Sequence, residues 1–464
     1  MHAQFGSETM SNLTGAMSIA VGALLTDQAA LQTTSNNIAN VNTPGYSRQR
    51  PIMVEADPVV FGSLTFGNGV VLQKVESLRD AILELRLHGE TQQQSRLDAV
   101  VSAMRQVEPM FSGSSGDIGD QLSKFFNSIQ ELSTDPSSPA RRQGVLTAAN
   151  NLANAFRTVS GNLQQQRNNL DLSVSQAAQQ VNVVTKQIAK LNGQITMMQN
   201  LHQDTSSFED QRTVLIRQLS GLIDVSVIRS DNGLTLTTVS GTALVAGDRN
   251  FDIGTQMDVS GVLHIFSQGA DITGTLSGGE LAGLLAVRDQ KIPGLLAGLD
   301  TLAAGLANAL NTAHRSGFDL NGSGGGDLFV PPSAGPGAAA SFAVAISDPS
   351  RLAASSDGSP GSNGNLAALA AVSDQPVVAG QTPRDIYANL VFHVGNEVSN
   401  GLAELNASTL ILQQLQDQRG SISGVSLDEE AAHMIEYQHA FAAAARVVTT
   451  VSDMLDVAVN LGRY

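Results

Sequence analysis

The 464-residue sequence contains no cysteine and no tryptophan, and aromatic side chains make up only 4% of it. The absence of cysteine excludes disulfides, zinc–thiolate sites and cysteine nucleophiles. Because aromatics are so few, deep aromatic ligand pockets are not expected. Basic charge is also short: 26 Lys and Arg against 42 Asp and Glu give 26 − 42 = −16. A chain this acidic argues against nucleic acid as a partner, because phosphate binding needs a basic surface.

Long apolar runs are absent as well, since none reaches the ~18 residues of a membrane span. Residues 17–25 have the length of a signal-peptide core, but no Lys or Arg precedes them and the apolar pattern continues beyond Asp27. We therefore interpret them as the start of a mature helix. We expect no membrane span and no cleaved signal peptide. Residues 1–9 lie outside the pattern, which makes Met10 a candidate start.

Apolar residues recur at seven-residue spacing near both ends of the chain. The first series contains Met17, Leu24, Leu31 and Ile38, with companions Leu13, Ala20, Asp27, Thr34 and Val41; Leu13 is included in the assembly seam. The second series contains Leu427, Met434, Phe441, Val448 and Leu455, with companions Ala431, Gln438, Ala445, Ser452 and Val459. Such heptads predict two coiled-coil helices and identify the residues of an assembly seam. Each helix needs a partner, because a lone helix of this kind is marginal in water.

A turn is predicted directly after the first heptad helix. Asn42, Pro44, Gly45 and Tyr46 form its motif. Proline pushes the residue before it out of the helical region, and glycine accepts a positive φ. Residues 46–75 then lack helical periodicity and are expected to be extended and irregular.

The middle of the chain is predicted to be mainly helical. Apolar stripes indicate helices near 78–107, 117–132, 139–198, 281–312 and 384–418, the fourth broken by Pro293. The longest would form a rod of about 90–100 Å. Alternating residues and the hairpin signal Asp231-Asn232-Gly233 predict strands between them.

These patterns predict an elongated, mainly α, multidomain protein with terminal coiled-coil helices, a core of long helices and a small inserted β-rich domain. The expected domains are residues 10–45 with 421–464 for assembly, 46–223 with 281–420 for the long-helix core, and 224–280 for the β-rich outer domain.

No catalytic, cofactor or metal site is predicted. His433 and His439 lie six residues apart, which places them on different helix faces, and no HExxH spacing occurs. Residues 322–326 lack the Lys of a phosphate loop. The segment that starts at Asp319 resembles the start of a calcium loop but has Val330 where the final Glu would stand. An enzyme is therefore the least favoured reading.

The motifs at the two ends resemble one known group of proteins. SNNIANVNTPGY at 35–46 looks like the N-terminal motif of bacterial flagellar rod, hook and hook-associated proteins. Its continuation Ser47-Arg48-Gln49 resembles the hook-associated protein 1 (FlgK) family in particular. So do SGVSLDEEAA at 423–432, Tyr437-Gln438, AAAARVV at 442–448 and Met454-Leu455-Asp456.

The resemblance implies a structural, self-assembling protein of the hook–filament junction, needed for flagellum assembly and motility. It implies an extracellular position, reached through the flagellar type III export channel without a cleaved signal. The implied partners are further copies of the chain, the hook protein, hook-associated protein 3 and a cytoplasmic export chaperone. Two alternatives stay open: a hook or rod protein of the same group, and a coiled-coil export or tethering module.

Overall fold

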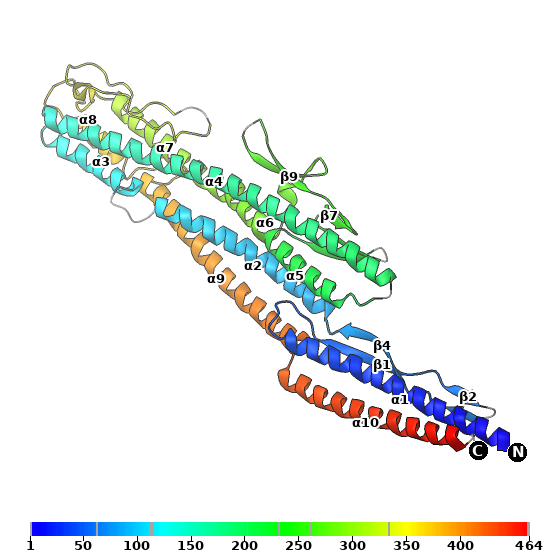
Figure 1. Ribbon diagram of the computed structural model, residues 1–464. Coiled ribbons are helices and arrows are strands. Elements are labelled where there is room, and N and C mark those ends of the chain that lie inside the picture. The colour runs from blue at the N-terminus through cyan, green and yellow to red at the C-terminus, as the bar shows by residue number, and fades with distance from the viewer. Residues whose placement is uncertain are drawn as a thin grey trace.

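The computed structural model describes residues 2–61, 64–111, 116–201, 203–230, 233–259, 261–332 and 335–461. The molecule is long and narrow, and the two chain ends lie together at its slender end (Figure 1). The predicted fold class is confirmed, because long helices dominate and the small sheets are inserted between them. The hairpin residues Asp231 and Asn232 lie outside the described residues.

The slender end is built from the first and last helices. Helix α1 (His2–Ala39) and helix α10 (Leu427–Leu461) run antiparallel, side by side. A β-ribbon covers a second face of α1: β1 (Gln49–Glu55) pairs with β4 (Val70–Ser77), and β2 (Val59–Phe61) pairs with β3 (Leu64–Phe66). The Thr26 hydroxyl, which donates to Gly22 O, lies 3.5 Å from Val70 O at this contact.

The body of the molecule consists of long helices that lie roughly along its axis (Figure 1). They are α2 (Ala81–Val107), α3 (Ile118–Ser133), α4 (Pro139–Asn200), α5 (Ser206–Leu222), α6 (Gly279–Ala286), α7 (Ile292–Arg315), α8 (Gly364–Ala371) and α9 (Pro383–Ser423). The 62 residues of α4 form a rod of about 93 Å. Polar side chains cap the helix starts: Asp80, Asp117, Ser138 and Thr382 each accept a backbone N–H of the first turn.

The long apolar stripe of α4 lies in the core of this body. Its predicted members are buried, among them Val145, Leu152, Phe156, Leu163, Val174, Val181, Ile188 and Ile195. They pack against α3, α5, α6 and the strands in turn along the rod. A core spread along one rod gives the elongated shape that the spacing predicts.

The segment predicted as one helix interrupted at Pro293 is continuous. A π-helical segment (Val287–Lys291) joins α6 to α7, and the wider π-helical turn accommodates Pro293, which cannot donate a backbone hydrogen bond to it. This segment turns Arg288 inward, where the buried guanidinium binds Asp171 and Asp289. By length and composition alone, 279–315 could cross a membrane. That is weak evidence, because core helices pass the same test and Leu299, Leu302 and Leu306 are fully buried here.

Two small sheets lie beside α4. One has the order β5 (Ser226–Ser230), β6 (Gly233–Thr237), β7 (Ala243–Ala246), β8 (Arg249–Asn250). The other has the order β11 (Ala270–Asp271), β10 (Leu263–Ser267), β9 (Ile253–Met257). Side-chain amides of α4 hold both sheets. Asn192 donates to Leu234 O and Gly247 O, and Asn182 bonds both backbone groups of Ile253.

The close crossing of α6 and α2 generates the first prediction. A Cβ on Gly283 would lie 2.4 Å from Arg96 O, whereas a Cβ on Gly161 in α4 would meet nothing within 4 Å. We expect Gly283→Ala to lower the free energy of unfolding by about 1–3 kcal/mol through overpacking. Gly161→Ala should raise it by about 0.5–1 kcal/mol, because alanine restricts the unfolded chain. Urea unfolding of both variants measures the contrast, and a stabilised Gly283→Ala would refute the close crossing.

Candidate functional site

The two heptad series meet along the contact between α1 and α10. All five predicted positions of α1, from Leu13 to Ile38, are partly buried, and its companion Ala20 is 4% exposed. On α10, Met434, Val448 and Leu455 are partly buried. Phe441 and Leu427 are more open, at 37% and 52% exposure. The chain therefore supplies each terminal helix with the other as its partner.

Beside the series that contains Met434, Val448 and Leu455, a second row of α10 residues contacts α1. This row differs in part from the companion positions that the sequence predicts. Gln438 and Val459 are exposed, while Val451 is buried and Tyr437 is partly buried. The predicted companions Ala445 and Ser452 are partly buried, so the second row is broader than the sequence predicts. The physical reason is that including Tyr437 and Val451 while leaving Gln438 outside buries more apolar area.

One polar flaw remains in the contact. Asp27 on α1 is partly buried, and burial raises the pKa of its carboxyl. The pKa of Tyr437 is also raised, first by burial and then by Glu436, Glu430 and Asp27. The carboxylate and the phenol therefore lie near one another across the pair, and both resist ionisation.

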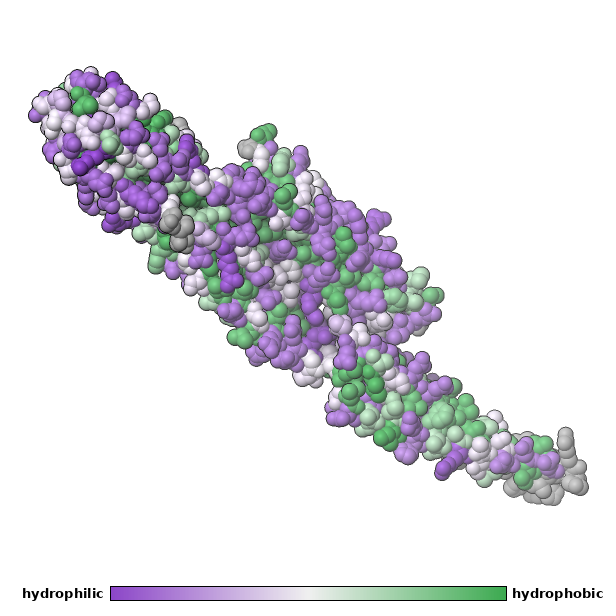
Figure 2. Space-filling view, turned by 60° about the vertical axis from the view of Figure 1, so that its left-hand side comes forward, coloured by the Kyte–Doolittle hydropathy of each residue, from purple (hydrophilic) through white to green (hydrophobic). Residues whose placement is uncertain are grey.

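Apolar side chains remain uncovered on the outer faces of the terminal helices. Figure 2 shows hydrophobic surface gathered over the slender end of the molecule. Side chains exposed by 41% to 62% include Val21 and Leu25 on α1 and Ile435, Val447, Met454, Val457 and Val459 on α10. The pairing of α1 with α10 thus leaves much of the apolar surface of both helices in contact with water.

Where the slender end meets the body, Asn37 is the centre of a hydrogen-bond network that we call the joint. Its Nδ2 donates to Gln49 O (2.8 Å) and to Glu430 Oε2 (3.0 Å). Its Oδ1 accepts from Gln49 N (2.9 Å) and from the hydroxyl of Tyr46 (2.8 Å). This 1% exposed amide therefore uses all of its hydrogen-bonding capacity to tie α1, β1 and α10 together.

Arg48 binds the start of the last helix. Its Nε lies 2.6 Å from Glu430 Oε1, and its Nη1 lies 2.6 Å from Glu429 Oε2. Its backbone N–H donates to Ser423 O at the end of α9. Glu430 is 2% exposed, so Arg48 and Asn37 together neutralise and solvate a buried carboxylate.

A second ion-pair cluster attaches this network to the body. Arg79 binds Asp210 (3.0 Å), Glu209 and the carbonyl of Ser206 at the start of α5. Asp210 also accepts the backbone N–H of Ser47 at 3.1 Å. Burial raises the pKa of Asp210, although Arg79 and Ser47 act in the opposite direction.

A third cluster of ion pairs holds α2, α5 and α9 together near the turn at Gly45. Glu84 accepts from Arg217 (3.1 Å) and Arg419 (2.6 Å). The Nη2 of Arg419 also donates to Gly45 O at 3.0 Å. This bond attaches the turn directly to α9.

The structure separates the four residues of the predicted turn motif. Gly45 has φ = +83°, and the hydroxyl of Tyr46 reaches Asn37. Burial, followed by the charges of Asp210, Glu430 and Asp204, raises the pKa of Tyr46 to about 12. Asn42 and Pro44 lie exposed on the outside of the turn. A cleft of about 700 Å³ remains between this turn and helices α4 and α5.

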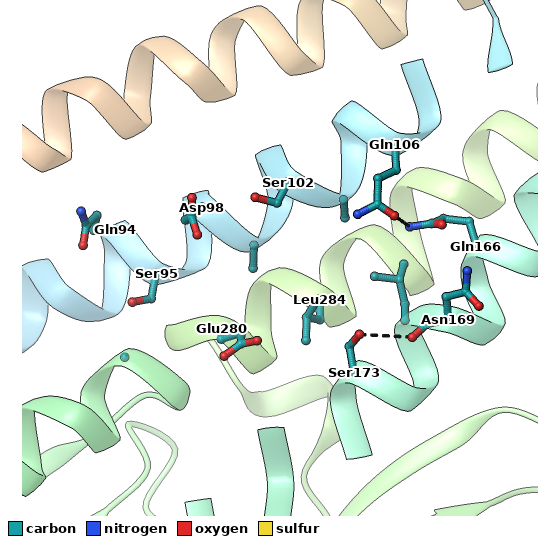
Figure 3. A pocket seen from close by; sticks show the side chains of 14 residues that line it. Gln94, Ser95, Asp98, Ser102, Gln106, Gln166, Asn169, Ser173, Glu280 and Leu284 are labelled. Carbon is teal, nitrogen blue, oxygen red and sulfur yellow. Dashed lines mark hydrogen bonds between the residues drawn. The ribbon is translucent and has the colours of Figure 1, made fainter. Parts of the chain in front are cut away.

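A second cavity, of about 370 Å³, lies between α2, α4 and α6 (Figure 3). Its lining mixes polar and apolar side chains, and Gln106 accepts a hydrogen bond from Gln166. Burial, then the nearby charge of Asp98, raises the pKa of Glu280. The described residues that line it include no His, Lys or Arg, so the two carboxylates have no basic partner there. Within the described ranges, no group of three or more His, Asp or Glu side chains could hold a metal ion.

Sequence reasoning identified the turn but assigned no role to the polar residues that fix it. Asn37, Arg48 and Glu430 all stand in the two quoted terminal motifs. The signal that could have indicated their pairing is opposite charge, since a basic residue follows the first motif and three acidic residues lie in the second. Arg79 and Asp210 carry no local signal, because their pairing depends on the fold of α5.

Comparisons with known proteins agree with this arrangement. Residues 104–329 match the family described as "Flagellar hook-associated protein FlgK helical domain". Residues 418–461 match "Flagellar basal body rod FlgEFG protein C-terminal", and 17–46 match "Flagella basal body rod protein". The terminal segments are thus of a kind found in flagellar rod proteins, while the central helices distinguish the hook-associated branch.

Whole-length relatives give the same answer. The chain is 27% identical to flagellar hook-associated protein 1 of Escherichia coli, over 95% of this chain and 98% of that protein. It is 29% identical to the Bacillus subtilis protein of the same name, over 94% and 96%. A solved structure of the flagellar hook junction protein FlgK from Burkholderia pseudomallei shares the fold, with a TM-score of 0.65 at 18% identity. The match covers 73% of this chain and all of that one.

A long-helix body with paired terminal helices and rod-type end segments defines a structural protein of the bacterial flagellum. Its central helices and its relatives specify the branch, and the chain belongs to the flagellar hook-associated protein 1 (FlgK) family. It is a structural protein of the hook–filament junction and not an enzyme.

The joint generates the second prediction. Asn37→Ala removes the acceptor of the Gln49 N–H and a donor to the buried Glu430. The substitution should therefore lower the free energy of unfolding by about 2 kcal/mol or more. The Gln49 amide should then exchange at least tenfold faster in hydrogen-exchange measurements. Asn36→Ala is the matched control, because Asn36 is exposed and does not contact this N–H. Equal protection of Gln49 in both variants would contradict the role of Asn37.

The turn generates the third prediction. A Cβ on residue 45 would lie 2.1 Å from Val214 Cγ2, and φ is positive there. Gly45→Ala should therefore lower the free energy of unfolding by about 2–4 kcal/mol. Backbone strain contributes about 1–2 kcal/mol of this and the steric clash contributes the rest. Val214→Ala removes the clashing methyl, so the double variant should regain only the steric part. Thermal unfolding of the four proteins measures this coupling, and strictly additive effects would count against the contact.

Proposed function

We propose that the chain builds the junction as a homo-oligomer in which paired terminal helices of neighbouring copies pack together. The observation that carries the proposal is the uncovered apolar surface on the outer faces of α1 and α10. Exposed patches of this kind mark interaction sites. The assembly residues on the proposed seam are those of the two heptad series, supplemented by Val21, Leu25, Ile435, Val447 and Val457.

The hook protein and hook-associated protein 3 are the proposed partners on the two sides of the junction. The support is the rod-type character of both terminal segments, because flagellar proteins with similar ends can continue one another's packing. Isolated hooks test the proposal directly: purified chain should bind at their tips, and hook-associated protein 3 should then bind to the capped hooks. A chain that bound elsewhere along the hook would favour the tethering alternative.

We also propose that the chain is exported through the flagellar type III channel without a cleaved signal, and that a cytoplasmic chaperone binds α10 before export. The weak contact between the terminal helices supports this. Both terminal helices have weak seams, with Asp27 in one and an open Phe441 in the other, so they separate at modest cost. A chain exported in this way should keep residues 10–30 when it is recovered from the culture medium.

We also propose three functional units. Residues 10–45 and 421–464 assemble, 46–223 and 281–420 form the stiff body, and 224–280 form an outer domain. Within residues 46–223 the β-ribbon is an exception, because it lies against α1 and would therefore move with the assembly unit.

The assembly surface generates the fourth prediction. Val457 is 58% exposed, so Val457→Asp should leave the single chain folded. In the assembled junction the same change would bury a charge. We expect the variant protein to keep its helical content but fail to bind hook tips, and the cells to lose motility. Leu455→Asp should in addition separate α10 from α1. Val259→Asp, at a fully exposed position near the small sheets, is the control and should swim normally. Full motility of Val457→Asp would refute the surface.

A further inference from the structure

His88 on α2 is a buried ionisable group that no part of the proposed assembly uses. It is 6% exposed, and neither ring nitrogen has a hydrogen-bond partner in the described part of the chain. The nearest carboxylate atom, Glu84 Oε2, lies 4.0 Å from Nε2. Apolar neighbours on the same helix, Leu83 and Leu87, pack with Leu412 of α9. An imidazole held in this way is accommodated only while it is neutral.

The charged groups around His88 come from three helices. Glu84 belongs to α2 itself, Arg217 to α5 and Arg419 to α9. One carboxylate therefore already serves two guanidinium groups. Arg419 also donates to Gly45 O, so the same cluster fastens the turn of the joint. A proton on His88 would add a third cation beside a single anion, at the place where the slender end is attached.

We propose that protonation of His88 opens the joint, so that acid releases the pair of terminal helices from the body while both parts stay folded. The imidazolium competes with Arg217 and Arg419 for Glu84. When Arg419 moves, the carbonyl of Gly45 loses its donor on α9. Displacement of Arg419 at the end of α9 takes one cation away from the charged ring and lets water reach it, which lowers the free energy of the imidazolium.

Burial, reinforced by Arg217 and opposed by Glu84, lowers the pKa of His88 from 6.5 to about 4. Because this pKa is lower in the closed state, the contribution of His88 to the stability of the closed joint is complete above pH 6.5. The contribution is lost progressively as the pH falls toward 4. Relative to neutral pH, the pKa shift corresponds to a rise in the equilibrium constant for opening of the joint of roughly 300-fold at low pH and about 80-fold at pH 4.5.

Asp210 in the neighbouring cluster acts in the opposite sense. Its pKa is raised, so acid favours its closed form. The net response of the joint is therefore the sum of two opposed groups, and a His88 variant isolates the opening component.

The absence of cysteine allows a direct test on the full-length chain. Spin labels on Gln32→Cys in α1 and Gln414→Cys in α9, both exposed, report the distance across the joint by double electron–electron resonance. Between pH 7.5 and pH 4.5 we expect the distance distribution to broaden, with unchanged helical content by circular dichroism. His88→Leu, which cannot be protonated, should keep the narrow distribution at both pH values.

Two further variants complete the experiment. His393→Leu, at an exposed histidine of α9, should broaden as the parent chain does. His88→Gln is neutral but polar, and it replaces His88→Leu as the test if the leucine variant folds poorly. The proposal is overturned if the parent distribution is unchanged at pH 4.5, or if the neutral His88 variants broaden as much as the parent.

Discussion

The hydrogen bonds of Asn37 are the constraint on which the arrangement of the two ends depends. One buried amide joins residues near the start of the chain to Glu430, almost four hundred positions later, and to the first strand of the ribbon. Arg48 then neutralises the same glutamate. Buried polar groups of this kind add little net stability but penalise every other arrangement, because each misplaced partner leaves an unpaired group. The direction in which the slender end leaves the body is set by this geometry.

The terminal helices and the joint divide the work between them. In the contact between the helices only small residues of α1 such as Ala20 and Ala30 are fully covered, while its large apolar residues are partly buried and Leu25 is exposed. Such a contact buries little apolar area per residue and therefore contributes modestly to stability. The joint fixes one orientation of the terminal-helix pair relative to the body, which the contact between the helices alone does not do. A subunit built in this way presents an oriented apolar surface that stays exposed until a neighbouring subunit covers it.

Much of this fold could be predicted from the sequence, because its signals are local. The 4-3 stripe of α4, the turn at Gly45 and the strands between 224 and 280 follow from periodicity and glycine chemistry. The burial of Tyr437 and Val451 on α10 could not be predicted, since each stands one residue before a predicted companion position and only the shape of α1 decides between neighbouring positions. Nor could the pairing of Arg79 with Asp210, which depends on how α5 folds back. The heptad positions identify helices that pair, but not which faces remain free.

The antiparallel return of the last helix to the first has a kinetic consequence. Contacts between α1 and α10 join the most distant parts of the chain, so closing them carries the largest loop entropy in the molecule. The body, whose α3, α4 and α5 are consecutive, can form earlier from local contacts. We therefore expect closure of the slender end to follow formation of the body.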